Sequence, residues 1–116
     1  MIRERDAGKR CISCPEIHPV IDAGHFRRRE LMTTRWDYRN VNGQGVKENR
    51  FEGGRTYEQS LEIDRRWGRG VAKELMRKSA QIRQWDIRDL DVLTDAARRG
   101  FFVYKQVYDE LAGLGD

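Results

Sequence analysis

Apolar residues recur at helical spacing through the second half of the chain, beginning at Thr56. Thr56 and Gln59 match the capping-box pattern that marks the start of a helix. Tyr57 and Leu61 are four residues apart and give this helix an apolar edge. Because glycine commonly follows the last turn of a helix, Gly68 is expected to end it. The pattern therefore predicts a first helix between Thr56 and Gly68.

Two further helices follow in the same pattern. Val71, Leu75, Met76 and Ile82 recur at helical spacing and define the second helix. Asp86 is expected to cap a third helix, because its carboxylate can accept hydrogen bonds from the free N–H groups of a first turn. The apolar face of that helix comprises Ile87, Leu90, Leu93, Ala97, Phe101, Tyr104, Tyr108 and Leu111.

The apolar stripe of the third helix continues through Gly100 without interruption. Since glycine weakens a helix without always ending it, we predict one long helix, with a bend at Gly100 as the alternative. A stripe of this length is more apolar surface than a small N-terminal unit can cover alone. We therefore expect the helical region to pack on the rest of the chain or to form a homodimer through these helices.

The first half of the chain is divided by prolines and glycines. Pro15 and Pro19 bracket a short segment, and Val20, Ile21 and Phe26 are predicted to form the two arms of a β-hairpin that presents His25.

A short helix is expected around residues 49–52, after a glycine-loosened loop and before the glycine pair at 53–54. Residues 1–54 are thus predicted to form a ββα unit, and residues 55–116 a helical extension. The predicted fold class is α+β, mostly α.

The composition restricts the classes of protein to consider. A length of 116 residues suits one domain, and 36% charged against 38% hydrophobic residues predicts a thin core and a well-solvated surface. No apolar run is long enough to span a bilayer, and the N-terminus lacks the apolar stretch of a signal peptide. We therefore expect a cytoplasmic protein without a membrane partner.

Residues suited to cutting a phosphodiester lie between positions 22 and 52. Such a cut needs a base to activate water and a cation to hold the charge that builds on the phosphate. His25 is a candidate base, and Asp22, Asn49 and Glu52 offer the hard oxygen ligands that Mg²⁺ or Mn²⁺ prefers. A lone histidine near an aromatic residue is more often a packed or surface side chain. Only the combination of these residues predicts a nuclease.

Positive charge gathers around the same segment. The net charge is +4, from 23 basic against 19 acidic residues. The clustered basic residues are Arg27, Arg28, Arg29, Arg35, Arg39, Lys47, Arg50 and Arg55. A solvated arginine surface accounts for most such runs. Because this cluster coincides with the nuclease candidates, we predict that it contacts DNA phosphates.

Linked motifs across the chain carry a family resemblance. They are Cys11-Ile-Ser-Cys14, Asp22-Ala-Gly-His-Phe26, Arg39-Asn-Val-Asn-Gly-Gln44 and Asn49-Arg-Phe51, with continued likeness to Ala72. Together they resemble the phage NinG (Rap) recombination endonuclease family over nearly the whole chain. Members of that family are similar to HNH, or ββα-metal, endonucleases. The resemblance implies metal-dependent cleavage of branched DNA, such as a Holliday junction, during phage recombination in the host cytoplasm.

The resemblance also implies roles for single residues. His25 matches the general base, Asn40 the asparagine that braces the loop, and Asn49 the metal ligand at the start of the helix. Glu52 matches a further acidic residue of the endonuclease VII type of junction resolvase. Many HNH sites carry their first metal ligand directly before the histidine, where this chain has a glycine, and Asp22 is the best substitute.

The cysteines depart from the family pattern. Where the family has a second Cys-x-x-Cys, this chain has Gly45-Val-Lys-Glu48, so Cys11 and Cys14 leave a tetrahedral zinc shell half empty. A closed four-cysteine Zn²⁺ site is excluded within one chain. We expect the Cys11–Cys14 pair to persist as a turn without metal. A mixed Zn²⁺ site completed by Glu48 and His18 is the alternative.

Three functions are compatible with these residues. The favoured function is a metal-dependent endonuclease for branched or structured DNA. The second is a DNA-binding or interaction protein of HNH descent that has lost cleavage together with the second cysteine pair. The third is a helical interaction protein that uses the C-terminal stripe.

Overall fold

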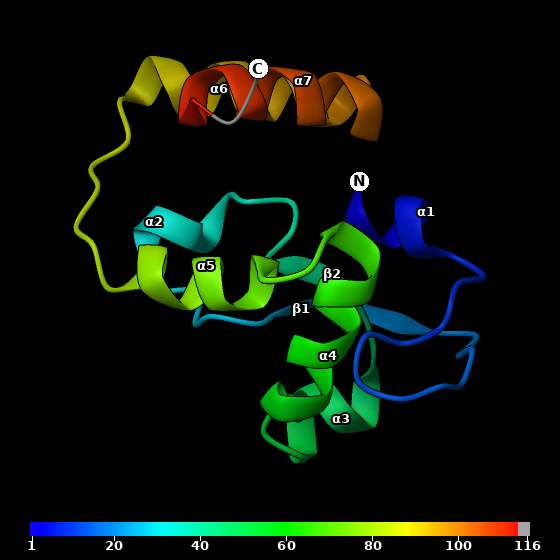
Figure 1. Cartoon of the computed structure of the whole chain (residues 1–116). Helices are drawn as coiled ribbons and strands as arrows, with labels where there is room; N and C mark the ends of the chain where they lie inside the picture. The colour runs from blue at the N-terminus through cyan, green and yellow to red at the C-terminus, as the bar shows by residue number, and fades with distance from the viewer. Residues whose placement is uncertain (114–116) are drawn as a thin grey trace.

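The computed structural model describes residues 1–113 (Figure 1). The elements are α1 (Ile2–Asp6), β1 (Ile21–His25), α2 (Met32–Arg35), β2 (Val41–Gly45), α3 (Val46–Phe51), α4 (Thr56–Trp67), α5 (Val71–Ser79), α6 (Ile87–Arg98) and α7 (Phe101–Ala112). The described part of the chain thus has seven helices and one two-stranded sheet, which confirms the α+β, mostly α class. The last three residues of the predicted helical extension lie outside the described residues.

The sheet is an antiparallel pair formed by β1 and β2. Ile21 pairs with Gly45 and His25 pairs with Val41 at the two ends of the register. The prediction that Val20–Ile21 and Phe26 form the two arms was wrong. Only Ile21 lies in a strand, Val20 and Phe26 flank the two ends of β1, and the second arm is β2. The Phe26 N–H donates to the Asn40 carbonyl at 2.9 Å. The second arm, Val-Asn-Gly-Gln-Gly, is buried throughout and shows no apolar alternation. It therefore gave no strand signal in the sequence.

Helix α3 follows β2 directly and contacts both strands, so the chain order from residue 21 is β-β-α. The predicted short helix is present, although it begins at Val46 rather than near Asn49. Gly53 and Gly54, with φ of 63° and 77°, follow it in the left-handed region, as expected for residues that end a helix.

Helix α4 begins at the predicted residue but not by the predicted cap. Arg55, at φ 48°, precedes the helix, and Thr56 is its first helical residue with no capping-box hydrogen bond. The Gln59 side chain instead donates to the Gly54 carbonyl at 2.5 Å. Gly68 ends the helix as predicted.

The buried face of α4 also differs from the predicted one. Tyr57 and Leu61 are 71% and 57% exposed, whereas Gln59, Glu62 and Ile63 are buried. The face that packs is therefore mostly polar. Glu62 accepts hydrogen bonds from Arg65 and Arg66, and the Gln59 nitrogen donates to Gly54, contacts that a pattern of apolar positions does not reveal.

Helices α5 and α6 start where the sequence indicated. Val71 and Leu75 of α5 are buried, but Met76 is half exposed and Ile82 lies beyond the helix end. Asp86 caps α6 and accepts a hydrogen bond from Arg88 N–H at 2.7 Å.

The long helix predicted through Gly100 is two helices. Gly100 has φ 109°, so the chain turns there, and α6 and α7 lie side by side at the top of Figure 1. Most of the predicted apolar stripe faces inward: Leu93, Tyr104 and Tyr108 are buried against Tyr38 in one cluster, whereas Ile87 is 76% exposed. The surplus apolar surface that motivated a homodimer is thus largely covered by the chain itself. Homodimerisation stays a prediction.

A second cluster lies beneath the cysteine turn and combines Ile12, Phe26, Ile63, Val71, Ala72 and Leu75. Both clusters draw residues from either side of position 54. No helix among residues 1–113 has the length and apolarity needed to cross a bilayer.

Helix α1 ties the sheet to the C-terminal helices. Asp6, 3% exposed, accepts a 2.7 Å hydrogen bond from Gly43 N–H in β2. Arg5 donates to the Val41 carbonyl at 2.9 Å, and its guanidinium lies 5.0 Å from the Phe101 ring centroid. These buried, charge-assisted hydrogen bonds hold β2 in place.

Candidate functional site

Asp22 and Asn49 meet where β1 faces α3. The Asn49 amide donates to Asp22 Oδ2 at 3.0 Å. Arg50 grips the same carboxylate with two bonds, Nε to Oδ2 at 2.9 Å and Nη2 to Oδ1 at 3.1 Å. The Arg50 and Asn49 hydrogen bonds lower the pKa of Asp22, so this buried carboxylate is ionised at neutral pH.

His25 lies at the end of β1, in a different environment. Its side chain is half-buried and lines a cavity of about 490 Å³ together with Arg35, Trp36, Tyr38 and Leu90, among others. Burial is the main cause that lowers the pKa of His25, and the charges of Arg29 and Arg35 lower it further. The imidazole is therefore neutral at pH 7, the state that a general base requires.

Asn40 braces the chain just after His25. Its Oδ1 accepts from Arg27 N–H at 2.8 Å, and its Nδ2 donates to the Arg27 carbonyl at 3.2 Å. Asn40 is fully buried, so these two bonds fix the backbone next to His25 in one conformation. This arrangement is of the kind that the resemblance implied for Asn40.

The structure does not bring His25 to the Asp22–Asn49 contact. Three positions separate Asp22 from His25 in β1, so their side chains leave opposite faces of the strand. At about 3.4 Å of rise per residue they stand roughly 10 Å apart along it. The base and the oxygen ligands predicted for one site are therefore on two sides of the hairpin in this conformation.

Glu52 forms no hydrogen bond or ion pair with Asp22 or Asn49. It follows the end of α3, and its carboxylate lies 3.2 Å from Arg55 Nε and 3.8 Å from Lys47 Nζ. A divalent ion would thus be offered the Asp22 carboxylate and, if the Asn49 amide turned its oxygen to the place where its Nδ2 now lies, one amide oxygen. That donor set suits Mg²⁺, which commonly takes one or two protein ligands and completes its shell with water and phosphate.

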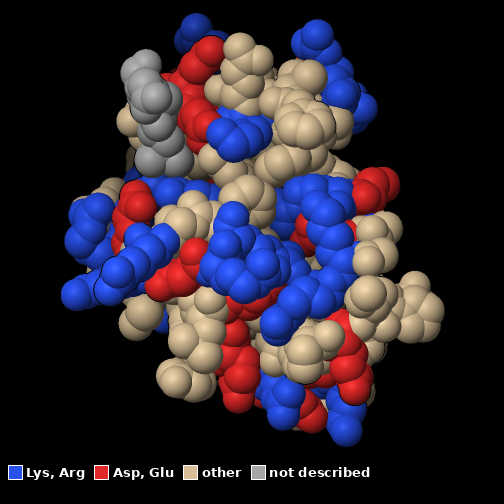
Figure 2. Space-filling model, turned by 45° about the vertical axis from the view of Figure 1, so that its right-hand side comes forward, with Lys and Arg blue, Asp and Glu red and all other residues tan. Residues whose placement is uncertain are grey.

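The basic residues divide into exposed and structural ones. Arg28 and Arg29 are exposed and form none of the structure's salt bridges within residues 1–113. Lys47, Arg50 and Arg55 are also exposed but pair with carboxylates. Figure 2 shows Lys and Arg side chains spread over one face, with Asp and Glu interspersed.

Three of the arginines predicted to contact DNA also make contacts within the protein. Arg39 is 9% exposed and binds Asp37 through two nitrogens, so the fold occupies most of its guanidinium, and its contact with DNA stays a prediction. Arg27 donates to Ser79 at 2.9 Å, and the Arg35 guanidinium lies 4.8 Å from the Trp36 ring centroid. Arg27 and Arg35 nevertheless keep partial exposure.

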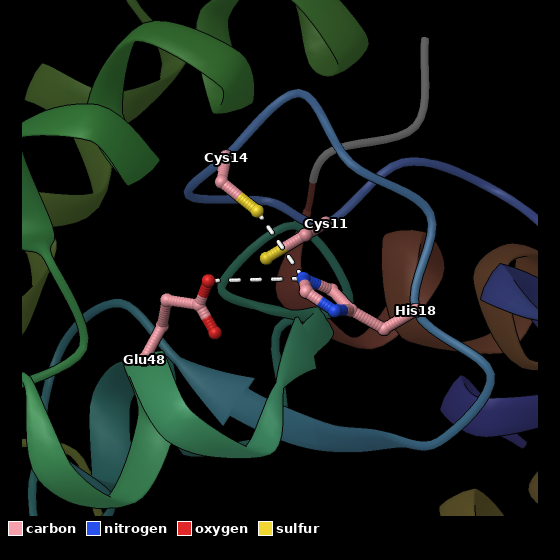
Figure 3. A group of neighbouring side chains, drawn as sticks. All are labelled: Cys11, Cys14, His18 and Glu48. Atoms are coloured by element: carbon pink, nitrogen blue, oxygen red, sulfur yellow. Dashed lines mark hydrogen bonds and ion pairs between the residues drawn. The ribbon is translucent and has the colours of Figure 1, made fainter.

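A second group of side chains converges beside the start of α3. Cys11 and Cys14 come from the turn before β1, His18 from the following loop and Glu48 from α3 (Figure 3). One ligand atom from each lies within 4.8 Å of the others. Cys14 Sγ is 3.2 Å from His18 Nε2, which is 3.7 Å from a Glu48 carboxylate oxygen. This is the only cluster of three or more potential His, Cys, Asp or Glu ligands found among residues 1–113.

The two thiols have unlike surroundings. Burial raises the pKa of Cys11, but hydrogen bonds from the Ser13 hydroxyl and the Gly45 and Ser13 N–H groups outweigh it and lower that pKa overall. Burial raises the pKa of Cys14 to about 11. Both cysteines are free of a disulfide. The Cys11 sulfur thus sits in a preformed set of donors suited to a thiolate.

Comparison with known proteins agrees with the motif order. The family model described as the bacteriophage lambda NinG protein matches residues 1–104. The chain belongs to the NinG family. No curated protein and no solved structure matches it. The NinG match spans the hairpin, α3, the cysteine turn and the helices as far as the first residues of α7, so both side-chain groups lie inside the family region.

One residue of this NinG chain was missed as part of a site. Gly45 was interpreted only as a loop-loosening residue, yet its position borders the Cys11, His18 and Glu48 side chains. The available signal was a histidine four residues after Cys14.

Proposed function

We propose that this NinG-family protein is a metal-dependent endonuclease that acts on branched or structured DNA, of the Holliday-junction or recombination-intermediate type. The contact between Asp22 and Asn49 carries the proposal, because it brings a carboxylate and a side-chain amide together where the strand meets the helix. The amide now faces Asp22 with its nitrogen, so the proposal has it turn its oxygen toward the ion when metal binds. Exposed basic residues on the same helix and in the loop after β1 supply phosphate contacts.

Each residue has a distinct task under this proposal. A bound Mg²⁺ or Mn²⁺, held by Asp22 and Asn49, would stabilise the negative charge that develops on the phosphate. Neutral His25 accepts the proton of the attacking water, and Asn40 holds the backbone beside it. Because His25 and Asp22 leave opposite faces of β1, the proposal requires the end of β1 to turn the imidazole toward α3 when DNA binds. The Asn40–Arg27 hydrogen bonds, which hold this backbone in the free protein, would have to rearrange in that step.

A second candidate is a NinG-family protein that binds structured DNA without cutting it. The bidentate Arg50–Asp22 pair favours this candidate, since the guanidinium already neutralises the carboxylate that an ion would need. The separation of His25 from Asn49 favours it as well. Under this candidate, α3 and the Arg28–Arg29 loop are a phosphate-binding surface only.

The test compares binding and cleavage on the same DNA. A labelled four-way junction and a linear duplex of the same sequence are incubated with the full chain in Mg²⁺, in Mn²⁺ and in chelator. His25→Ala and Asn49→Ala are measured beside Glu58→Gln, which changes an exposed carboxylate on α4. The endonuclease proposal expects metal-dependent junction cleavage that falls about 100-fold or more in His25→Ala, with binding retained.

The outcomes separate the two candidates. Tight junction binding by the parent without cleavage in any metal supports the second candidate and rejects the first. Cleavage that persists in His25→Ala and Asn49→Ala points to a contaminating nuclease or another site and also rejects the first. Absence of both binding and cleavage rejects both candidates.

A further inference from the structure

We propose that Cys11, Cys14, His18 and Glu48 are the four ligands of a zinc site. The inference reverses the expectation of a metal-free turn. It does not depend on DNA cleavage.

The spacing of the four donors suits a tetrahedral ion. Zinc bonds of about 2.3 Å to sulfur and about 2.0–2.2 Å to nitrogen or oxygen place neighbouring ligand atoms roughly 3.3–3.8 Å apart. The Cys14–His18 and His18–Glu48 separations of 3.2 and 3.7 Å are within a few tenths of an ångström of that range. The imidazole of His18 points between the thiols and the carboxylate (Figure 3). Small side-chain shifts therefore suffice to close a four-ligand shell.

Gly45 explains how His18 can lie so close to the other three donors. A Cβ at position 45 would lie 2.8 Å from His18 Nε2 and 2.3 Å from Glu48 Oε2. The His18 ring thus fills space that any side chain at residue 45 would need. The glycine at position 45 thus leaves room for both the His18 ring and the Glu48 carboxylate.

The cysteine turn has the backbone hydrogen bonds that a thiolate ligand needs. Cys11 Sγ accepts from Ser13 N–H at 3.4 Å and from Gly45 N–H at 3.3 Å. Cys11 and Cys14 are 1% and 8% exposed, so their sulfurs are shielded from solvent. A buried group of two thiols, a carboxylate and an imidazole is stabilised as a set by a divalent cation.

The chemistry of the donors favours zinc over the ion proposed for catalysis. Thiolate and imidazole ligands suit Zn²⁺, whereas Mg²⁺ and Mn²⁺ prefer oxygen donors alone. Four protein ligands also make a closed, structural shell. Because Glu48 directly precedes Asn49, this ion would fix the first turn of the helix that carries Asn49, and its loss would loosen that helix.

The experiment measures metal content and stability of the full chain. The protein is purified without chelator, and zinc per chain is determined by elemental analysis beside thermal unfolding with and without chelator. We expect about one zinc per chain, a lower Tm after chelation and recovery on adding Zn²⁺. Co²⁺ substitution is expected to produce thiolate-to-metal charge-transfer absorption.

Variants of His18 and Glu48 test whether these two residues bind the zinc. His18→Ala and Glu48→Ala are expected to weaken zinc affinity by about 100-fold or more, beyond the cost typical of outer-shell changes. His25→Ala and Glu58→Gln are the matched controls and keep the zinc. Because a variant that unfolds also loses metal, Glu48→Cys is the second measurement. It keeps zinc and raises the Co²⁺ charge-transfer absorption about 1.5-fold, since three thiolates replace two.

Two results would overturn the inference. One is a folded parent chain with negligible zinc whose Tm responds to neither chelator nor Zn²⁺. The other is a folded His18→Ala or Glu48→Ala variant that binds zinc as tightly as the parent. Zinc binding without DNA cleavage would leave this site intact and reject only the endonuclease.

Discussion

Replacing Asn40 by alanine removes the brace beside His25 and tests its energetic role. Asn40 is fully buried and makes bonds of 2.8 and 3.2 Å to the two backbone groups of Arg27. Each bond contributes about 0.5–1.5 kcal/mol net, and leaving a buried partner unpaired adds to the loss, so we expect about 2–3 kcal/mol for Asn40→Ala. For a chain of this size that corresponds to a fall in Tm of about 10 °C.

Asn49→Ala is the matched control for this prediction. Asn49 is partly exposed and makes one side-chain bond, to Asp22, so its loss should cost about 1 kcal/mol or less. Thermal and urea unfolding followed by circular dichroism compare the two variants with the parent. Both substitutions should reduce cleavage, but only Asn40→Ala should be strongly destabilised. An Asn40→Ala variant as stable as Asn49→Ala would refute the bracing role.

Two further predictions concern charge. Burial raises the pKa of Asp6, but its Arg5 partner and other contacts lower it overall, so its stabilisation is present above about pH 3.9 and is lost as the pH falls through the lower folded pKa. Urea midpoints should therefore decline more steeply below pH 4 in the parent than in Asp6→Asn, and parallel curves would contradict this. Replacing Arg28 and Arg29 together by alanine should reduce the steepness of the plot of log affinity against log salt by about 2. Replacing Arg98 and Arg99 by alanine removes the same charge and should leave that slope unchanged. Equal slopes in the two double variants would show that the Arg28–Arg29 loop does not contact DNA.

Local signals predicted several helix boundaries correctly. The Asp86 cap and the Gly68 end depend on residues within one turn of the boundary, and both appear in the structure. Gly100 shows where such signals fail. A 3.6-residue period continues across it, but its φ of 109° reverses the chain, and the contacts that favour the reversal come from Tyr38, far away in sequence.

The second strand failed for a related reason. Asn42 and Gln44 of β2 are buried without being apolar, because Trp67 and Ser13 supply hydrogen-bond partners from distant segments. A pattern of apolar positions cannot reveal partners of this kind. The fold class followed from the sequence, whereas this strand required the tertiary structure.

The sequence predicted which residues belong to the candidate site but not how they are arranged in space. Asp22 and Asn49 were grouped by chemistry, and the structure joins them. His25 was assigned to the same centre, but strand alternation separates it from Asp22. His18 and Glu48 were the alternative completion of the cysteine pair, and their convergence depends on the missing side chain of Gly45.

The most direct test of the endonuclease is a single-turnover rate on a four-way junction with excess protein and Mg²⁺ or Mn²⁺. The parent and His25→Ala are compared at equal fractional binding, so that affinity does not enter the ratio. The account predicts a metal-dependent cut that slows about 100-fold or more in the variant. Equal rates in parent and variant, or a parent that binds the junction and never cuts it, would contradict it.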